Sequence, residues 1–77
     1  MNYQHIIVGI GKVSLEDIKK FYETNPQDKE MYTILESAVD NSRADILAWA
    51  YQRGLIDSRL ANLMTTPLKV KVGLLKI

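Results

Sequence analysis

The segment formed by residues 33–57 constrains the fold more than any other part of the chain. It contains two runs in which apolar residues recur at spacings of three and four, the pattern of amphipathic helices. Asn25, which precedes a proline, is predicted to cap the first helix, and Ser42 the second. A polar turn at residues 40–42 separates the runs, and Gly54 suits the left-handed backbone that ends a helix. We therefore predict a helical hairpin, a packing unit that often serves as a recognition surface.

Length and composition narrow the class of protein. The chain has 77 residues, no cysteine, and ten basic against nine acidic residues. This length indicates one domain over residues 1–77, near the lower limit for folding on a hydrophobic core alone. Without cysteine there is no disulfide scaffold or thiolate metal site, and a net charge of +1 provides no overall attraction to nucleic acid or anionic lipid. The N-terminal segment lacks a basic leader, and no apolar run approaches the roughly 20 residues of a membrane span, so we expect a cytoplasmic protein without a membrane partner.

Capping residues predict further helices on both sides of the hairpin. Ser14 caps a helix over residues 15–23, and Asp57 caps a short helix over residues 58–64. The inward-facing residues expected on all four helices are Leu15, Ile18, Phe21, Tyr22, Met31, Leu35, Ala38, Val39, Ile46, Leu47, Trp49, Ala50, Leu60, Leu63 and Met64, with Ile34 at the edge of the buried stripe.

Both ends of the chain are predicted to be β-strands. Residues 3–10 are rich in β-branched side chains and end at glycines. From residue 68 apolar residues alternate with lysines, the period of a half-exposed strand, and residues 73–77 form an apolar end that is paired with another strand or buried in a partner. We therefore expect an α+β domain in which N- and C-terminal β-strands flank about four short α-helices. The terminal strands also offer a route to a homodimer.

The central hairpin resembles an ankyrin repeat over residues 33–57, about a third of the chain. Residues 33–36, TILE, stand where that family has TPLH, and residues 44–54 are similar to the second helix and its terminating glycine. Residues 14–21 are similar to the second helix of a preceding repeat. The two Asp-Ile pairs are 28 residues apart, however, where ankyrin repeats have a period of about 33. The resemblance implies a protein-binding module without enzyme activity.

A helix-turn-helix motif over residues 46–64 is the alternative interpretation of the same region. Its second helix would offer Ser58, Arg59 and Asn62 to base edges in DNA. Arg53 lies where this motif normally has a buried apolar residue, and Asp57 places negative charge at the entry. The basic residues are dispersed, whereas phosphate contacts require local clusters of them. DNA-binding regulation is therefore the second function that the sequence allows.

No residue cluster in the sequence has recognisable catalytic, cofactor or metal chemistry. Residues 9–14 precede a helix, as phosphate-binding loops do. They lack a glycine that the P-loop requires and the third glycine that the dinucleotide-binding fingerprint requires. His5 is the only histidine and has no neighbouring ligand in the sequence. We predict a protein that is not an enzyme and that uses no cofactor or metal.

The predicted function is non-catalytic protein binding, as an adaptor, regulator or inhibitor of a larger protein. Small self-contained domains of this size are common among phage and mobile-element proteins that block host factors. The predicted contact surface is an outward corner made by Tyr51, Gln52 and Arg53, together with Trp49, because aromatic residues and arginine are enriched in protein interfaces. The sequence names neither the partner nor its pathway.

Overall fold

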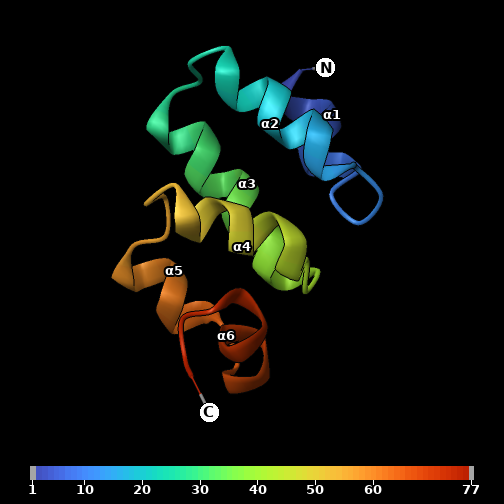
Figure 1. Ribbon diagram of the computed structural model, residues 1–77. Helices are drawn as coiled ribbons and strands as arrows, with labels where there is room; N and C mark the ends of the chain where they lie inside the picture. Colours follow the sequence, from blue (N-terminus) through green and yellow to red (C-terminus); the bar gives the residue numbers. More distant parts are fainter. Residues whose placement is uncertain (1, 77) are drawn as a thin grey trace.

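The protein is all-helical in the computed structural model, which describes residues 2–76 (Figure 1). This finding overturns the predicted α+β class, because both predicted terminal strands are helices. Ile77, which ends the predicted C-terminal strand, lies outside the described residues. The six helices are α1 (Tyr3–Val8), α2 (Leu15–Glu23), α3 (Asp28–Asp40), α4 (Ala44–Gln52), α5 (Ser58–Leu63) and α6 (Thr66–Val72).

Helix α1 replaces the predicted N-terminal strand. The side chain of Asn2 caps it by accepting a hydrogen bond of 2.9 Å from the backbone amide of His5. Ile6 is fully buried and Ile7 packs against the core beside it, while Ile10, in the loop that follows the helix, is also buried. The β-branched residues favour a strand only weakly, and the burial of these isoleucines against α3 outweighs that preference.

Helix α6 replaces the predicted C-terminal strand. Thr65 caps it by accepting from the amide of Leu68, Pro67 lies in the first turn, and Gly73 ends it with a left-handed φ of 98°. Leu68 and Val72 are buried four residues apart, a spacing that satisfies a helix as well as an alternating strand. The predicted homodimer through terminal strands therefore has no strand to use within residues 2–76.

The six helices form three stacked tiers, each made of two consecutive helices (Figure 1). One layer contains α1, α3 and α5, with α3 packed against both of the others; the second contains α2, α4 and α6, with α4 packed against both of the others. Helices α3 and α4 also pack against each other, so the middle tier joins the two layers. The resulting molecule is elongated, with extents of 36 × 22 × 18 Å.

The core follows this stack and is most complete in the middle tier. Ile34, predicted at the edge of the stripe, is fully buried because α3 contacts α1, α4 and α5. Leu63, predicted to face inward, is 49% exposed on α5, the last helix of its layer. The buried residues are Ile6, Ile10, Val13, Ile18, Met31, Ile34, Leu35, Ala38, Val39, Ile46, Leu47, Ala50, Leu60, Met64, Leu68 and Val72.

Two of the four predicted helix caps are correct. Ser14 caps α2 and Asp57 caps α5 through their side-chain oxygens, and Gly54 has the predicted left-handed φ, of 74°. Asn25 and Ser42 instead adopt left-handed φ angles of 57° and 53°, and the helices that follow begin two or three residues further on. Both residues therefore turn the chain between helices and do not cap them.

Arg43 ties the first tier to the second. Its Nη1 donates a 2.7 Å hydrogen bond to the backbone carbonyl of Ile10, in the loop between α1 and α2. Its Nε and Nη2 donate to both carboxylate oxygens of Asp45, at 3.1 and 2.9 Å. The hydrogen bonds from Arg43 lower the pKa of the Asp45 carboxyl, although partial burial opposes this. The arginine thus fixes the two turns at this end of the tiers.

Candidate functional site

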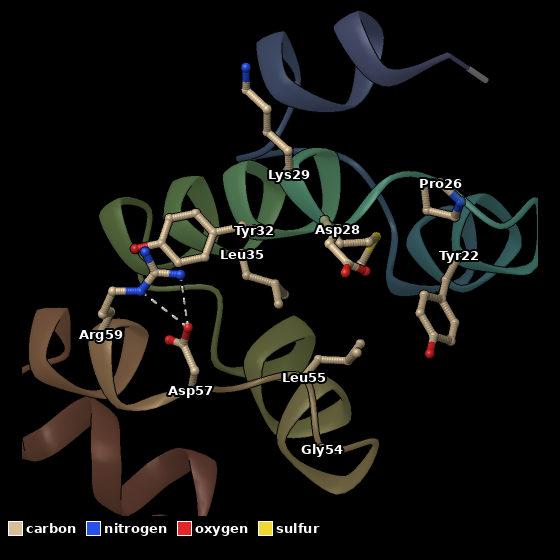
Figure 2. A pocket seen from close by; sticks show the side chains of 11 residues that line it. Tyr22, Pro26, Asp28, Lys29, Tyr32, Leu35, Gly54, Leu55, Asp57 and Arg59 are labelled. Carbon is tan, nitrogen blue, oxygen red and sulfur yellow. Dashed lines mark hydrogen bonds and ion pairs between the residues drawn. The ribbon is translucent and has the colours of Figure 1, made fainter.

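An open cleft of about 580 Å³ lies on the edge of the stack where the loops between tiers emerge (Figure 2). Its walls come from the end of α2, the loop after it, α3, and the loop from α4 to the start of α5. A smaller hollow of about 400 Å³ adjoins it and shares Tyr22, Pro26 and Asp28. The residues that line the larger cleft are Tyr22, Pro26, Asp28, Lys29, Met31, Tyr32, Leu35, Gly54, Leu55, Asp57 and Arg59.

The inner part of the cleft is apolar and aromatic. Leu35 projects into it from α3, and Leu55 projects from the loop before α5 (Figure 2). Leu35 is buried by the stack and Leu55 is half-buried, so the floor is anchored in the core on one side. Trp49 of α4 meets the Tyr22 ring edge-on, with centroids 5.4 Å apart and ring planes at 84°. This contact fixes the tyrosine that forms one wall of the cleft.

The opposite rim is formed by Arg59, which lies over the Tyr32 ring with its guanidinium carbon 4.8 Å from the ring centroid. The same guanidinium donates to the carboxylate of Asp57 at 3.3 Å. Asp57 in turn accepts from the amide of Leu60 at 2.9 Å, and this hydrogen bond, followed by those from Arg59, lowers the pKa of its carboxyl. Asp57 therefore stays ionised at neutral pH and serves as the cap of α5.

The structure brings one of the four predicted partner-binding residues into the lining of this edge. Arg53 follows the end of α4 and lines the smaller hollow, while the half-buried Trp49 lines neither hollow but contacts the Tyr22 ring. Tyr51, which is 41% exposed, and Gln52 face solvent from the last turn of α4 without lining either hollow. The predicted corner is therefore split between the cleft and a neighbouring surface.

The residues predicted for DNA binding all lie on α5 and are exposed. Helix α5 has only six residues, which is less than two turns. Ser58 and Asn62 are four residues apart and share its outward face, whereas Arg59 is turned toward Tyr32 and Asp57 at the cleft. The outward face of this helix therefore presents two uncharged side chains, and its one cation is already paired.

The sequence-based prediction missed most residues of the cleft. The sequence patterns predict Tyr22 only for the core and indicate no contact role for Leu55 or Tyr32. A local signal existed, because Pro26 and Gly54 mark the two loops that form the edge. These loops meet at one cleft because the tiers stack on one another, and local sequence patterns do not predict that stacking.

Comparison with known proteins gives no relative: no protein-family model, curated protein or solved structure matches the chain. The resemblance of residues 33–57 to an ankyrin repeat stays a prediction. No group of histidine and acidic side chains within residues 2–76 is arranged to hold a metal ion. Within residues 2–76, no helix combines the length and the apolar character that crossing a bilayer requires. The fold and the cleft define a class: a small all-α stack of three helix pairs with an open groove along its loop edge.

Proposed function

We propose that this protein is a non-catalytic binding module that takes up a segment of another protein in the cleft. It would act on that partner as an adaptor, a regulator or an inhibitor. The observation that carries the proposal is the cleft itself, where an apolar floor of Leu35 and Leu55 lies between Tyr22 and the stacked pair of Tyr32 and Arg59. Aromatic residues and arginine are enriched in the hot spots of protein interfaces, the residues that contribute most of the binding free energy.

The shape of the cleft favours a protein segment over a small ligand. The cleft has a volume of about 580 Å³ and is open to solvent along the edge of the stack. Pockets for small ligands enclose most of the ligand surface, whereas a bound segment of a larger protein remains joined to its own domain outside. An open groove with a fixed aromatic wall suits the second kind of partner.

The charges of the cleft support binding rather than turnover. Asp57 is committed to capping α5, and Arg59 is held by Asp57 and Tyr32. Asp28 and Lys29, both exposed at the start of α3, place opposite charges on the other rim. Charges of both signs at a rim set the orientation and the specificity of a partner more than its affinity.

Site-specific photo-crosslinking in the native host tests the proposal. The crosslinking amino acid p-benzoylphenylalanine would replace Asp28 at the cleft or, as a matched control, Asp40 at the other end of α3. Both aspartates are exposed and belong to the same helix, so the two variants differ mainly in location. We expect the cleft position to capture one protein that the control position does not. Equal capture at both positions, or capture of nucleic acid alone, would contradict the proposal.

A further inference from the structure

Arg59 is held at the rim of the cleft by two contacts that leave part of its guanidinium group free (Figure 2). Its Nε and Nη2 both donate to one carboxylate oxygen of Asp57, at 3.4 and 3.3 Å, and its guanidinium carbon lies 4.8 Å from the centroid of the Tyr32 ring. Nη1 has no hydrogen-bond partner within residues 2–76, and the side chain is 75% exposed. The outer edge of the guanidinium, formed by Nη1 and the second hydrogen of Nη2, is therefore free to donate to a ligand.

These contacts orient the arginine but stabilise the fold only weakly. Ion pairs between exposed side chains contribute little, and both hydrogen bonds to Asp57 are long. Asp57 caps α5 through the amide of Leu60 and does not need the arginine for that role. Tyr32 belongs to α3, so its ring positions Arg59 from a different helix. The result is a preoriented cation beside an apolar floor, which is a favourable arrangement for binding because little conformational freedom is left to lose.

From this geometry we infer that Arg59 binds an acidic side chain of the protein segment that the cleft takes up. This role rests on the proposed binding function and adds the chemistry that selects the partner. One edge of a guanidinium donates two parallel hydrogen bonds, which match the two oxygens of a carboxylate. The partner segment therefore has an aspartate or glutamate at Arg59 and an apolar side chain over Leu55, the half-buried residue of the floor.

A basic segment fits the same rim less well. The carboxylate of Asp57 already accepts hydrogen bonds from the amide of Leu60 and from Arg59, so the pair presents free donors outward more than free acceptors. On the facing rim, Asp28 and Lys29 are exposed and make no ion pair within residues 2–76. Because their charges are opposite, they favour neither sign of partner.

A phosphate group also fits less well than a carboxylate. Phosphate carries more negative charge and is typically bound by a cluster of arginines. Arg59 is the only arginine that lines the larger cleft, and Figure 2 shows Lys29 directed away from it. A single guanidinium edge suits the smaller charge and the planar shape of a carboxylate.

Selection of binding peptides by the full chain tests the inference. The probe is a phage-displayed library of random peptides of about 12 residues, a length typical of short recognition segments. Peptides fused to the coat protein at their carboxyl end have no free terminal carboxylate, so a selected carboxylate belongs to a side chain. We expect enrichment of aspartate or glutamate close to leucine or an aromatic residue. Enrichment of lysine or arginine, or no enriched peptide, would overturn the inference.

A double-mutant cycle with the tightest peptide assigns its acidic residue to Arg59. Replacing that residue with its amide should weaken binding to the wild type at least about tenfold, because a charged hydrogen-bond pair is lost. The same peptide change should have little effect on Arg59→Gln, which has already lost the facing group. Arg59→Lys keeps the charge without the forked edge and should bind about three- to tenfold more weakly than the wild type.

Lys71→Gln is the matched control for the cycle. Lys71 is an exposed cation of α6 that lines neither hollow, so this variant should show the full tenfold effect of the peptide change. A peptide change that weakens binding equally to the wild type and to Arg59→Gln would overturn the assignment. Equal loss of affinity in Lys71→Gln and Arg59→Gln would show that only net charge matters, and would overturn it as well.

Two further measurements locate the peptide and separate this inference from the proposed function. In the isotope-labelled full chain we expect chemical-shift changes at the Arg59 Nε–H and at the amides of residues 54–60; changes confined to other residues would overturn the inference. Tighter binding of a phosphoserine peptide than of the acidic one would assign the rim to phosphate instead. The photo-crosslink at position 28 does not depend on Arg59, so capture there with a failed cycle would retain the binding function and remove only the carboxylate contact.

Discussion

Replacement of Arg43 by alanine should destabilise the protein through the loss of a single tie between two tiers. The Arg43 side chain is 18% exposed and donates a 2.7 Å hydrogen bond to the carbonyl of Ile10, 33 residues away in the sequence. A hydrogen bond from a charged donor contributes about 1.5–3 kcal/mol, and the half-exposed ion pair with Asp45 adds less than about 1 kcal/mol. We therefore expect the free energy of unfolding to fall by about 2–3 kcal/mol.

Urea denaturation followed by far-ultraviolet circular dichroism measures this loss. For a domain of this size the free energy of unfolding falls by about 1 kcal/mol for each molar of urea. The urea concentration at the midpoint of unfolding should therefore be roughly 2 M lower for Arg43→Ala than for the wild type. Arg53→Ala is the matched control, because Arg53 is exposed and makes no ion pair within residues 2–76. It should change the midpoint by less than about 0.5 M, as most exposed substitutions do.

Two further variants separate the tie to Ile10 from the ion pair. Asp45→Ala removes only the ion pair and a favourable charge in the first turn of α4, so it should lower stability by about 1 kcal/mol. Arg43→Lys keeps the charge but loses the forked geometry that reaches both acceptors, and should fall between wild type and Arg43→Ala. The reasoning is wrong if Arg43→Ala unfolds with the same midpoint as Arg53→Ala, or if Asp45→Ala is as destabilising as Arg43→Ala.

Three other predictions concern backbone strain and pH. Ser42→Gly should raise the free energy of unfolding by about 0.5–1 kcal/mol, and with it the melting temperature, because Ser42 has a left-handed φ of 53° that glycine adopts without strain. An unchanged or lower melting temperature would count against strain at this position. Gly73→Ala should lower stability by about 1 kcal/mol through its φ of 98°, although space is free around it, and a neutral result in urea would show that α6 can end differently. The carboxyls of Asp45 and Asp57 have lowered pKa values, so the stability that they contribute is complete above their usual pKa of 3.8 and lost as pH falls through the lower folded values. Asp45→Asn combined with Asp57→Asn should therefore reduce the fall in urea midpoint between about pH 5 and about pH 2, and an unaltered pH profile would exclude these two groups as its cause.

The sequence alone determined the parts of the fold that depend on neighbouring residues. A side-chain cap acts over three residues, so Ser14 and Asp57 correctly mark the starts of α2 and α5. Helical spacing of apolar residues likewise predicted the burial of Leu35 and Leu47. The left-handed end of α4 at Gly54 follows from the chemistry of glycine, which needs no tertiary context.

Only the tertiary structure decided the two ends of the chain and the cleft. Helices α1 and α6 have six and seven residues, and helices of that length are unstable in isolation. The alternating residues around Leu68 and Val72 suit a strand and a helix equally, and packing against α4 selects the helix. The cleft joins loops near residues 26 and 54 only because successive tiers place both loops on one edge. Local patterns fix caps and periods, whereas the free energy that chooses between a short strand and a short helix comes from burial against partners distant in the sequence.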